Sequence, residues 1–151
     1  MRRIAIHSFV ITLLWLGFVC AISFMEAPVK FTAPGVVLKD ALSIGRVVFH
    51  ALNQVEWCAC LLLWTFVAFS SAVRTRCILL LVGAITAILV WQTWGLFPPM
   101  EVRAVKILAG ETLEPTWHHL AYIAVEIVKA FGLAALTTFQ IKAYKRAITS
   151  Q

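Results

Sequence analysis

Four long apolar segments take up most of the chain, at residues 4–24, 47–69, 77–97 and 117–141. A helix needs about 20 mostly apolar residues to cross the hydrocarbon core of a bilayer, and each segment reaches that length. The chain is 62% hydrophobic and 13% charged, whereas a soluble domain is about half apolar and a quarter charged. The sequence therefore predicts an all-α integral membrane protein, a single four-helix bundle over residues 1–151. It excludes a soluble, disordered or disulfide-stapled chain.

The first apolar segment follows Arg2 and Arg3, as the apolar part of a signal peptide would. Its apolar run is longer than the usual core of about 7–15 residues, and no small-x-small cleavage site follows it. We expect a retained membrane anchor.

Basic residues are distributed unevenly between the two ends of the predicted bundle. One end carries seven basic and no acidic residues: Arg2, Arg3, Arg74, Arg76, Lys142, Lys145 and Arg146. The other end carries five basic and five acidic residues: Lys30, Lys39, Arg46, Arg103, Lys106, Glu26, Asp40, Glu101, Glu111 and Glu114. Lysine and arginine are enriched in cytoplasmic loops, so we expect both termini in the cytoplasm and the chain in a bacterial inner membrane. The basic character indicates contact with anionic lipid, not with nucleic acid.

Each of the two outer loops is expected to hold a short amphipathic helix at the membrane interface. Pro34 is placed to open the first helix, which leads into span two and is expected to bend near Gly45. In the second loop, Pro98 and Pro99 are expected to end span three, and Gly110 to stop the helix that follows.

Three ionisable residues lie inside the spans, namely Glu56, Glu126 and Lys129. Ionisable residues at membrane depth are costly and mark functional sites by default. At about 1.5 Å per residue, both glutamates lie roughly 13 Å below the outer surface. Polar residues share one helical face in each span: Arg46, His50, Asn53, Glu56 and Cys60 in span two, and His119, Tyr122, Glu126 and Lys129 in span four. We therefore expect a polar pocket between spans two and four in the outer half of the bilayer.

Three interpretations of this pocket remain open. In the structural one, Lys129 neutralises Glu126 or Glu56 and the polar groups only hold helices together. In the second, a haem or a divalent metal is bound by His50 with His118 or His119, although the chain has no established ligand motif. In the third, the pocket holds a lipid, a quinone or another small molecule, or relays protons. Its candidate residues are His50, Asn53, Glu56, Tyr122, Glu126 and Lys129.

These interpretations lead to three hypotheses about function. The first is a non-enzymatic membrane protein, either a binding protein or an accessory subunit of a membrane complex. The second is a metal- or haem-binding membrane redox protein. The third is a small proton-coupled transporter that acts as a dimer, because four spans without an inverted repeat are few for a transporter. We expect a membrane-protein partner or a second copy of the chain.

The chain also resembles a known group of membrane proteins. Residues 26–31 carry an Ala-Pro-x-x-Phe pattern directly after the first span, residues 45–49 read Gly-Arg-Val-Val-Phe, and a histidine opens the fourth span. In these features the chain resembles a large uncharacterised family of small four-span membrane proteins, related to the eukaryotic transmembrane-205-type proteins. The resemblance implies a four-helix membrane domain without a settled activity. It singles out Ala27, Pro28, Phe31, Gly45, Phe49 and His119.

Overall fold

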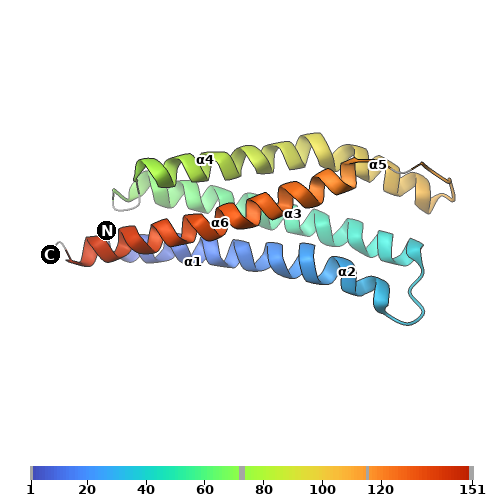
Figure 1. The fold of residues 1–151 in the computed structure, drawn as a ribbon, viewed down its shortest axis with the longest axis horizontal. Helices are drawn as coiled ribbons and strands as arrows, with labels where there is room; N and C mark the ends of the chain where they lie inside the picture. The colour runs from blue at the N-terminus through green and yellow to red at the C-terminus, as the bar shows by residue number, and fades with distance from the viewer. Residues whose placement is uncertain (1, 72–73, 115, 150–151) are drawn as a thin grey trace.

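A computed structural model describes residues 2–71, 74–114 and 116–149, and these residues form helices and no strand. The helices form long rods that pack side by side (Figure 1). The first rod consists of α1 (Arg2–Val19), a π-helix (Cys20–Glu26), α2 (Ala27–Val29) and a 3₁₀-helix (Lys30–Thr32). The second rod is α3 (Leu38–Phe69). The third consists of α4 (Arg76–Trp91), a second π-helix (Gln92–Leu96) and α5 (Phe97–Leu108), and the fourth is α6 (His118–Thr149).

Each rod contains a stretch that is long and apolar enough to cross a membrane. The four stretches are His7–Thr32, Leu38–Phe69, Arg76–Leu108 and His118–Arg146. The prediction of an all-α, multi-pass membrane bundle is confirmed. The start of α1 and the end of α6 lie at one end of the bundle, which we call the terminal end (Figure 1). The opposite end, where α2 and α5 lie, is called the distal end.

The packing order explains how spans two and four come to face each other. The helix α1 packs against α3 and α6, and α4 packs against the same two helices. Therefore α3 and α6 lie diagonally across the bundle, and their inward faces meet at its centre. The approach of α4 to α6 is close, because a Cβ on Gly132 would lie 3.3 Å from Cγ1 of Ile85.

The first outer loop differs from the expectation. Pro34 does not open a helix; α3 begins at Leu38 and continues to Phe69, so the amphipathic segment is the first part of span two. Pro28 lies within a helical run that continues to Thr32. It occupies the first turn of α2, where a missing N–H needs no helical partner. The chain reverses at Gly35, whose φ of 81° favours glycine.

The second outer loop is helical as expected, but it is not separate from span three. Pro98 and Pro99 do not end that span, because α5 follows directly on the π-helix and contains both prolines in its first turns. Gly110 has a φ of 98°, and α5 ends at Leu108, as its sequence predicted. Each amphipathic segment is thus a rigid extension of a span.

A seam of side-chain hydrogen bonds joins α3 to α4 and to the π-helix that follows it. Thr93 Oγ1 accepts from Asn53 Nδ2 at 2.9 Å and from Trp57 Nε1 at 3.1 Å. Seven residues earlier on α4, Thr86 Oγ1 accepts from Trp64 Nε1 at 2.9 Å. Both threonines also donate to the carbonyl one turn before them on their own helix. The two tryptophans are seven residues apart on one rod, and the two threonines are seven residues apart on the other. This matched spacing fixes the register of the two rods.

Replacing Thr93 with Val should loosen this seam. The change leaves the amide of Asn53 and the indole of Trp57 without their acceptor, and we expect a loss of about 1 kcal/mol in the free energy of unfolding. The measurement is unfolding in mixed detergent micelles, followed by circular dichroism. Thr138→Val is the matched control, because that exposed hydroxyl bonds to Ala134 of its own helix. Equal stability of the two variants would contradict a structural role for the seam.

Candidate functional site

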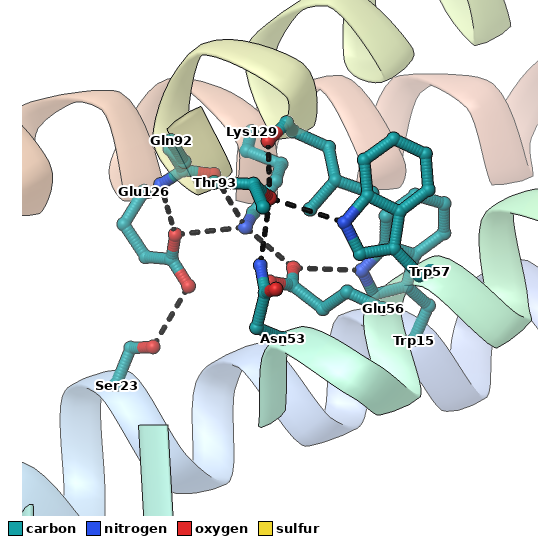
Figure 2. A network of polar contacts seen from close by, with 10 residues as sticks. Trp15, Ser23, Asn53, Glu56, Trp57, Gln92, Thr93, Glu126 and Lys129 are labelled. Atoms are coloured by element: carbon teal, nitrogen blue, oxygen red, sulfur yellow. Dashed lines mark hydrogen bonds and ion pairs between the residues drawn. The ribbon is translucent and has the colours of Figure 1, made fainter. Parts of the chain in front are cut away.

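The three ionisable residues of the spans meet in the centre of the bundle (Figure 2). Glu56 comes from α3, while Glu126 and Lys129 come from α6. All three side chains are at most 1% exposed. We call these three residues the buried charge cluster. The expectation that the polar faces of spans two and four meet is confirmed at this depth.

The ammonium group of Lys129 is the centre of the cluster. It forms ion pairs with Oε1 of Glu56 and, at 2.9 Å, with Oε2 of Glu126. It also donates to Oε1 of Gln92 at 2.8 Å. A lysine ammonium has three N–H donors, so each donor has an acceptor of its own.

The two carboxylates hold further hydrogen bonds. Oε1 of Glu56 accepts from the indole of Trp15 at 2.9 Å. Oε2 of Glu126 accepts from Nε2 of Gln92 at 2.6 Å, and its Oε1 accepts from the hydroxyl of Ser23 at 2.8 Å. All four helical rods therefore contribute to the cluster.

The local helix geometry directs these side chains toward the centre of the bundle. Glu126 and Lys129 are three residues apart on α6, so they lie on one face of that helix. The two residues that reach Glu126 from other rods both lie in π-helical turns. Ser23 is inside Cys20–Glu26, and Gln92 is the first residue of Gln92–Leu96. A π-turn closes its hydrogen bonds over five residues instead of four, which rotates the helical face and changes where the following side chains point.

Charge is not balanced within the cluster. One ammonium and two ionised carboxylates leave one negative charge in excess. An isolated buried charge is very costly in a medium of low dielectric constant, and a buried group avoids that cost by neutralising itself. A neutral cluster therefore needs one more proton or one more cation.

The outer members of the predicted polar face of span two point elsewhere. Arg46 forms an ion pair with Glu101 of α5. His50 is half exposed, its Nε2 lies 3.6 Å from Oε2 of Glu101, and its ring centroid lies 4.8 Å from that of Phe97. Arg46 and His50 thus fasten α5 onto α3 at the distal end, away from the buried charge cluster. Asn53 belongs to the seam with α4.

The outer members of span four also diverge. Tyr122 is buried one turn before Glu126 and meets the ring of Phe49 edge-on, with centroids 5.8 Å apart. His119 is exposed, and His118 stacks on Trp117 at a centroid distance of 4.3 Å. The predicted stripe is therefore buried only from Tyr122 onward.

Three residues of the network were missed from the sequence: Trp15, Ser23 and Gln92. A tryptophan in mid-span and a lone serine are ordinary features of membrane helices. Gln92 carried a usable signal, because an uncharged amide inside an apolar span also needs a partner.

The histidines predicted to bind a metal or a haem have other neighbours in the structure. In ranges 2–71, 74–114 and 116–149, no group of three or more His, Cys, Asp or Glu side chains has an arrangement that holds a metal ion. His50, His118 and His119 contact Glu101, Trp117 or solvent, as described above. Ligation of haem by these histidines stays a prediction.

Three of the residues singled out by the family resemblance surround Lys30 at the distal end, namely Phe31, Gly45 and Phe49. The Lys30 ammonium lies 5.5 Å from the ring centroid of Phe49 and 5.9 Å from that of Phe31. A Cβ on Gly45 would come within 2.8 Å of this nitrogen. No protein-family model, curated protein or solved structure matches the chain. The family assignment stays a prediction.

Replacing Lys129 with Met should strongly destabilise the bundle. The change leaves two buried carboxyl groups facing each other without their shared cation, and breaking a buried ion pair in this way costs about 3–5 kcal/mol. The measurement is the free energy of unfolding in mixed micelles near neutral pH. Lys142→Met, an exposed lysine on the same helix, is the matched control. Adding Glu126→Gln to Lys129→Met should recover part of the loss, and a double variant as unstable as the single one would contradict the pairing.

Proposed function

We propose that the chain is a multi-pass membrane protein that binds and releases one proton at the buried charge cluster. The observation that carries the proposal is the placement of one ammonium between two fully buried carboxylates. One added proton per chain would make the cluster electrically neutral. Among the interpretations of the polar pocket, this geometry favours the proton-relay one.

The same geometry disfavours a larger ligand in the cluster. Each N–H of Lys129 already has an acceptor, so none is left for a headgroup or a quinone oxygen. Glu126 likewise accepts on both of its oxygens. A proton is the ligand that fits without displacing any of these side chains.

A proton site at this depth suits a protein that couples proton binding to another event. Protonation removes one of the two negative charges that hold Lys129, so the forces between α3 and α6 depend on the state of the cluster. Such coupling serves a proton-coupled transporter that acts as a dimer, and it equally serves a binding protein that responds to pH.

We further propose a bacterial inner membrane, with both termini in the cytoplasm. The terminal end carries the surplus of lysine and arginine, which supports that orientation. The cluster then lies in the half of the bilayer that faces away from the cytoplasm.

The number of bound protons can be changed by substitution. We expect the native protein to hold one protonated carboxyl group near neutral pH. Glu56→Gln and Glu126→Gln should each hold none, because the remaining carboxylate balances Lys129. Lys129→Met should hold two. The measurement is the infrared carbonyl stretch of protonated carboxyl groups in lipid-reconstituted protein, compared in H₂O and D₂O.

Glu114→Gln is the control for this measurement, because Glu114 is an exposed carboxyl group in a loop. It should leave the infrared signal unchanged. Absence of a protonated carboxyl group at every pH in the native protein would overturn the proposal. A signal that survives in both single glutamine variants would place the proton elsewhere and also overturn it.

A second candidate function is that of an accessory subunit in a membrane complex. It is favoured by an apolar surface groove of about 750 Å³ over α3 and α4. Its floor contains Gly83 and Ala87, one turn apart on α4, and its walls contain Trp64, Trp91 and Trp94. Small residues at this spacing let a second membrane helix approach closely.

Gly83→Leu tests this candidate. No atom lies within 4 Å of a Cβ placed on Gly83, so the substitution fills the groove without disturbing the fold. If a partner helix occupies the groove, native mass spectrometry of the protein in mild detergent should show a stoichiometric complex that Gly83→Leu disrupts. Gly17→Leu, also on an open surface of a helix, is the matched control. A complex unaffected by Gly83→Leu would exclude the groove as its interface.

A further inference from the structure

We infer that Glu126 is the carboxyl group that carries the exchangeable proton, that Ser23 accepts its hydrogen bond, and that Glu56 is the permanent counter-ion of Lys129. This inference rests on the proposed function and names the proton-binding atom within it.

The hydrogen-bond partners of the two carboxylates differ in one decisive property. A protonated carboxyl group has an O–H that must find an acceptor when it is buried. Glu56 contacts an indole N–H and an ammonium group, which are both donors without acceptor capacity. A proton on Oε1 of Glu56 would point at the N–H groups of Trp15 and Lys129, which cannot accept it, so both contacts would break. A proton on the other oxygen, Oε2, would meet no acceptor among the contacts that the structure gives to Glu56. Glu56 therefore suits the ionised form.

Glu126 differs because one of its partners can reverse its role. Its Oε1 lies 2.8 Å from the hydroxyl oxygen of Ser23. A serine hydroxyl is both a donor and an acceptor, so it can donate to the ionised carboxylate and accept from the protonated one. The side chain of Gln92 cannot take this role by flipping, because its Oε1 is required by Lys129. The contacts thus give Glu126 a stable geometry in both states.

Backbone structure gives independent support. Both residues that reach Glu126 from neighbouring rods, Ser23 and Gln92, lie in π-helical turns. Trp15 and Glu56 lie in regular α-helix. π-Turns are rare and occur frequently at functional sites. The irregular backbone is thus concentrated on the partners of Glu126, while the Glu56 side of the cluster is built from ordinary helix.

The remaining titratable groups around the cluster leave the charge balance unchanged. On α6, Tyr122 lies one turn before Glu126, and on α3, Cys60 lies one turn after Glu56. Cys60 contacts the hydroxyl of Thr86. The phenol and the thiol are neutral in their ordinary states at neutral pH. From the first and third rods, the groups that reach the cluster are Trp15, Ser23 and Gln92, none of which titrates in the physiological range.

Proton uptake then has a simple course. The carboxylate of Glu126 gains a proton on Oε1, and the new O–H donates to the hydroxyl oxygen of Ser23. The hydroxyl hydrogen of Ser23 gives up its bond to Oε1 and turns away, while the bonds from Gln92 and Lys129 to Oε2 stay in place. Release reverses this step. Ser23 is only half-buried and lies on the distal side of the network, where Glu26 and Lys30 follow on the same rod as a partly buried ion pair at 3.2 Å. The proton therefore enters and leaves through the distal end of the bundle.

Isotope labelling can identify which carboxyl group is protonated, because the chain contains very little aspartate that would also take up the label. Its only aspartate is Asp40, which is exposed. In Glu126→Asp protein grown with carboxyl-¹³C aspartate, we expect the infrared band of the protonated carboxyl group to shift to lower frequency. In labelled Glu56→Asp protein, the band should keep its unlabelled frequency. Asp40 is present in both proteins and controls for labelling of the surface.

The outcomes separate this inference from the proposed function. A band that shifts in labelled Glu56→Asp and not in labelled Glu126→Asp would overturn the assignment to Glu126 and leave the proton-binding function intact. Partial shifts in both proteins would mean a proton shared between the glutamates, which also overturns the assignment. A native protein without any such band would overturn both.

Substitution of Ser23 tests the acceptor. In Ser23→Ala the band should remain but move to higher frequency, because the O–H loses its hydrogen bond, and exchange after a rapid pH change should slow at least severalfold. Ser23→Thr keeps the hydroxyl and should restore both properties. A Ser23→Ala protein with native frequency and native exchange rate would remove Ser23 from the pathway.

Discussion

The burial of the Lys129 ammonium group is the constraint on which this bundle depends. A charge taken out of water must be compensated by nearby groups, and here each of the three N–H donors needs an acceptor. Glu56, Gln92 and Glu126 supply these acceptors from the second, third and fourth rods. Trp15 and Ser23 of the first rod donate to the two carboxylates. A shift of any rod along its axis would leave one of these partners unsatisfied. The cluster therefore sets the relative positions of all four spans.

Polar groups at other depths have a different role. The seam between α3 and α4 uses neutral donors and hydroxyl acceptors, so its bonds survive a change of charge in the core. The pair of Arg46 and Glu101 is partly exposed at the distal end, where water and salt screen its charges. These contacts hold α4 and α5 against α3 independently of the protonation state. The contacts that hold α4 and α5 against α3 are thus separate from the charged groups of the buried charge cluster.

The fold was largely predictable from the sequence, and the site was predictable in part. Four apolar runs define the spans, and helical spacing brings Glu56 to the depth of Glu126 and Lys129. Spacing assumes a regular helix of 3.6 residues per turn, and this assumption fails at the two π-turns. Ser23 and Gln92 were not assigned to the site because a single hydroxyl or uncharged amide in an apolar span does not show which neighbouring helix supplies its partner. His50 and His119 were assigned to the polar faces because a stripe of residues on one helix does not show where a neighbouring helix stops covering it. The Pro98–Pro99 pair was misread because proline is compatible with the first turn of a new helical segment.

The two π-turns also have a consequence for evolution. Each is equivalent to one residue inserted into an otherwise regular helix. Loss of a single codon within Cys20–Glu26 or Gln92–Leu96 would restore the α-helical repeat. It would also rotate Ser23 or Gln92 away from Glu126, even with every remaining amino acid unchanged. In homologous chains, the lengths of the first and third rods would then be as informative about the presence of this centre as the identities of its glutamates and lysine.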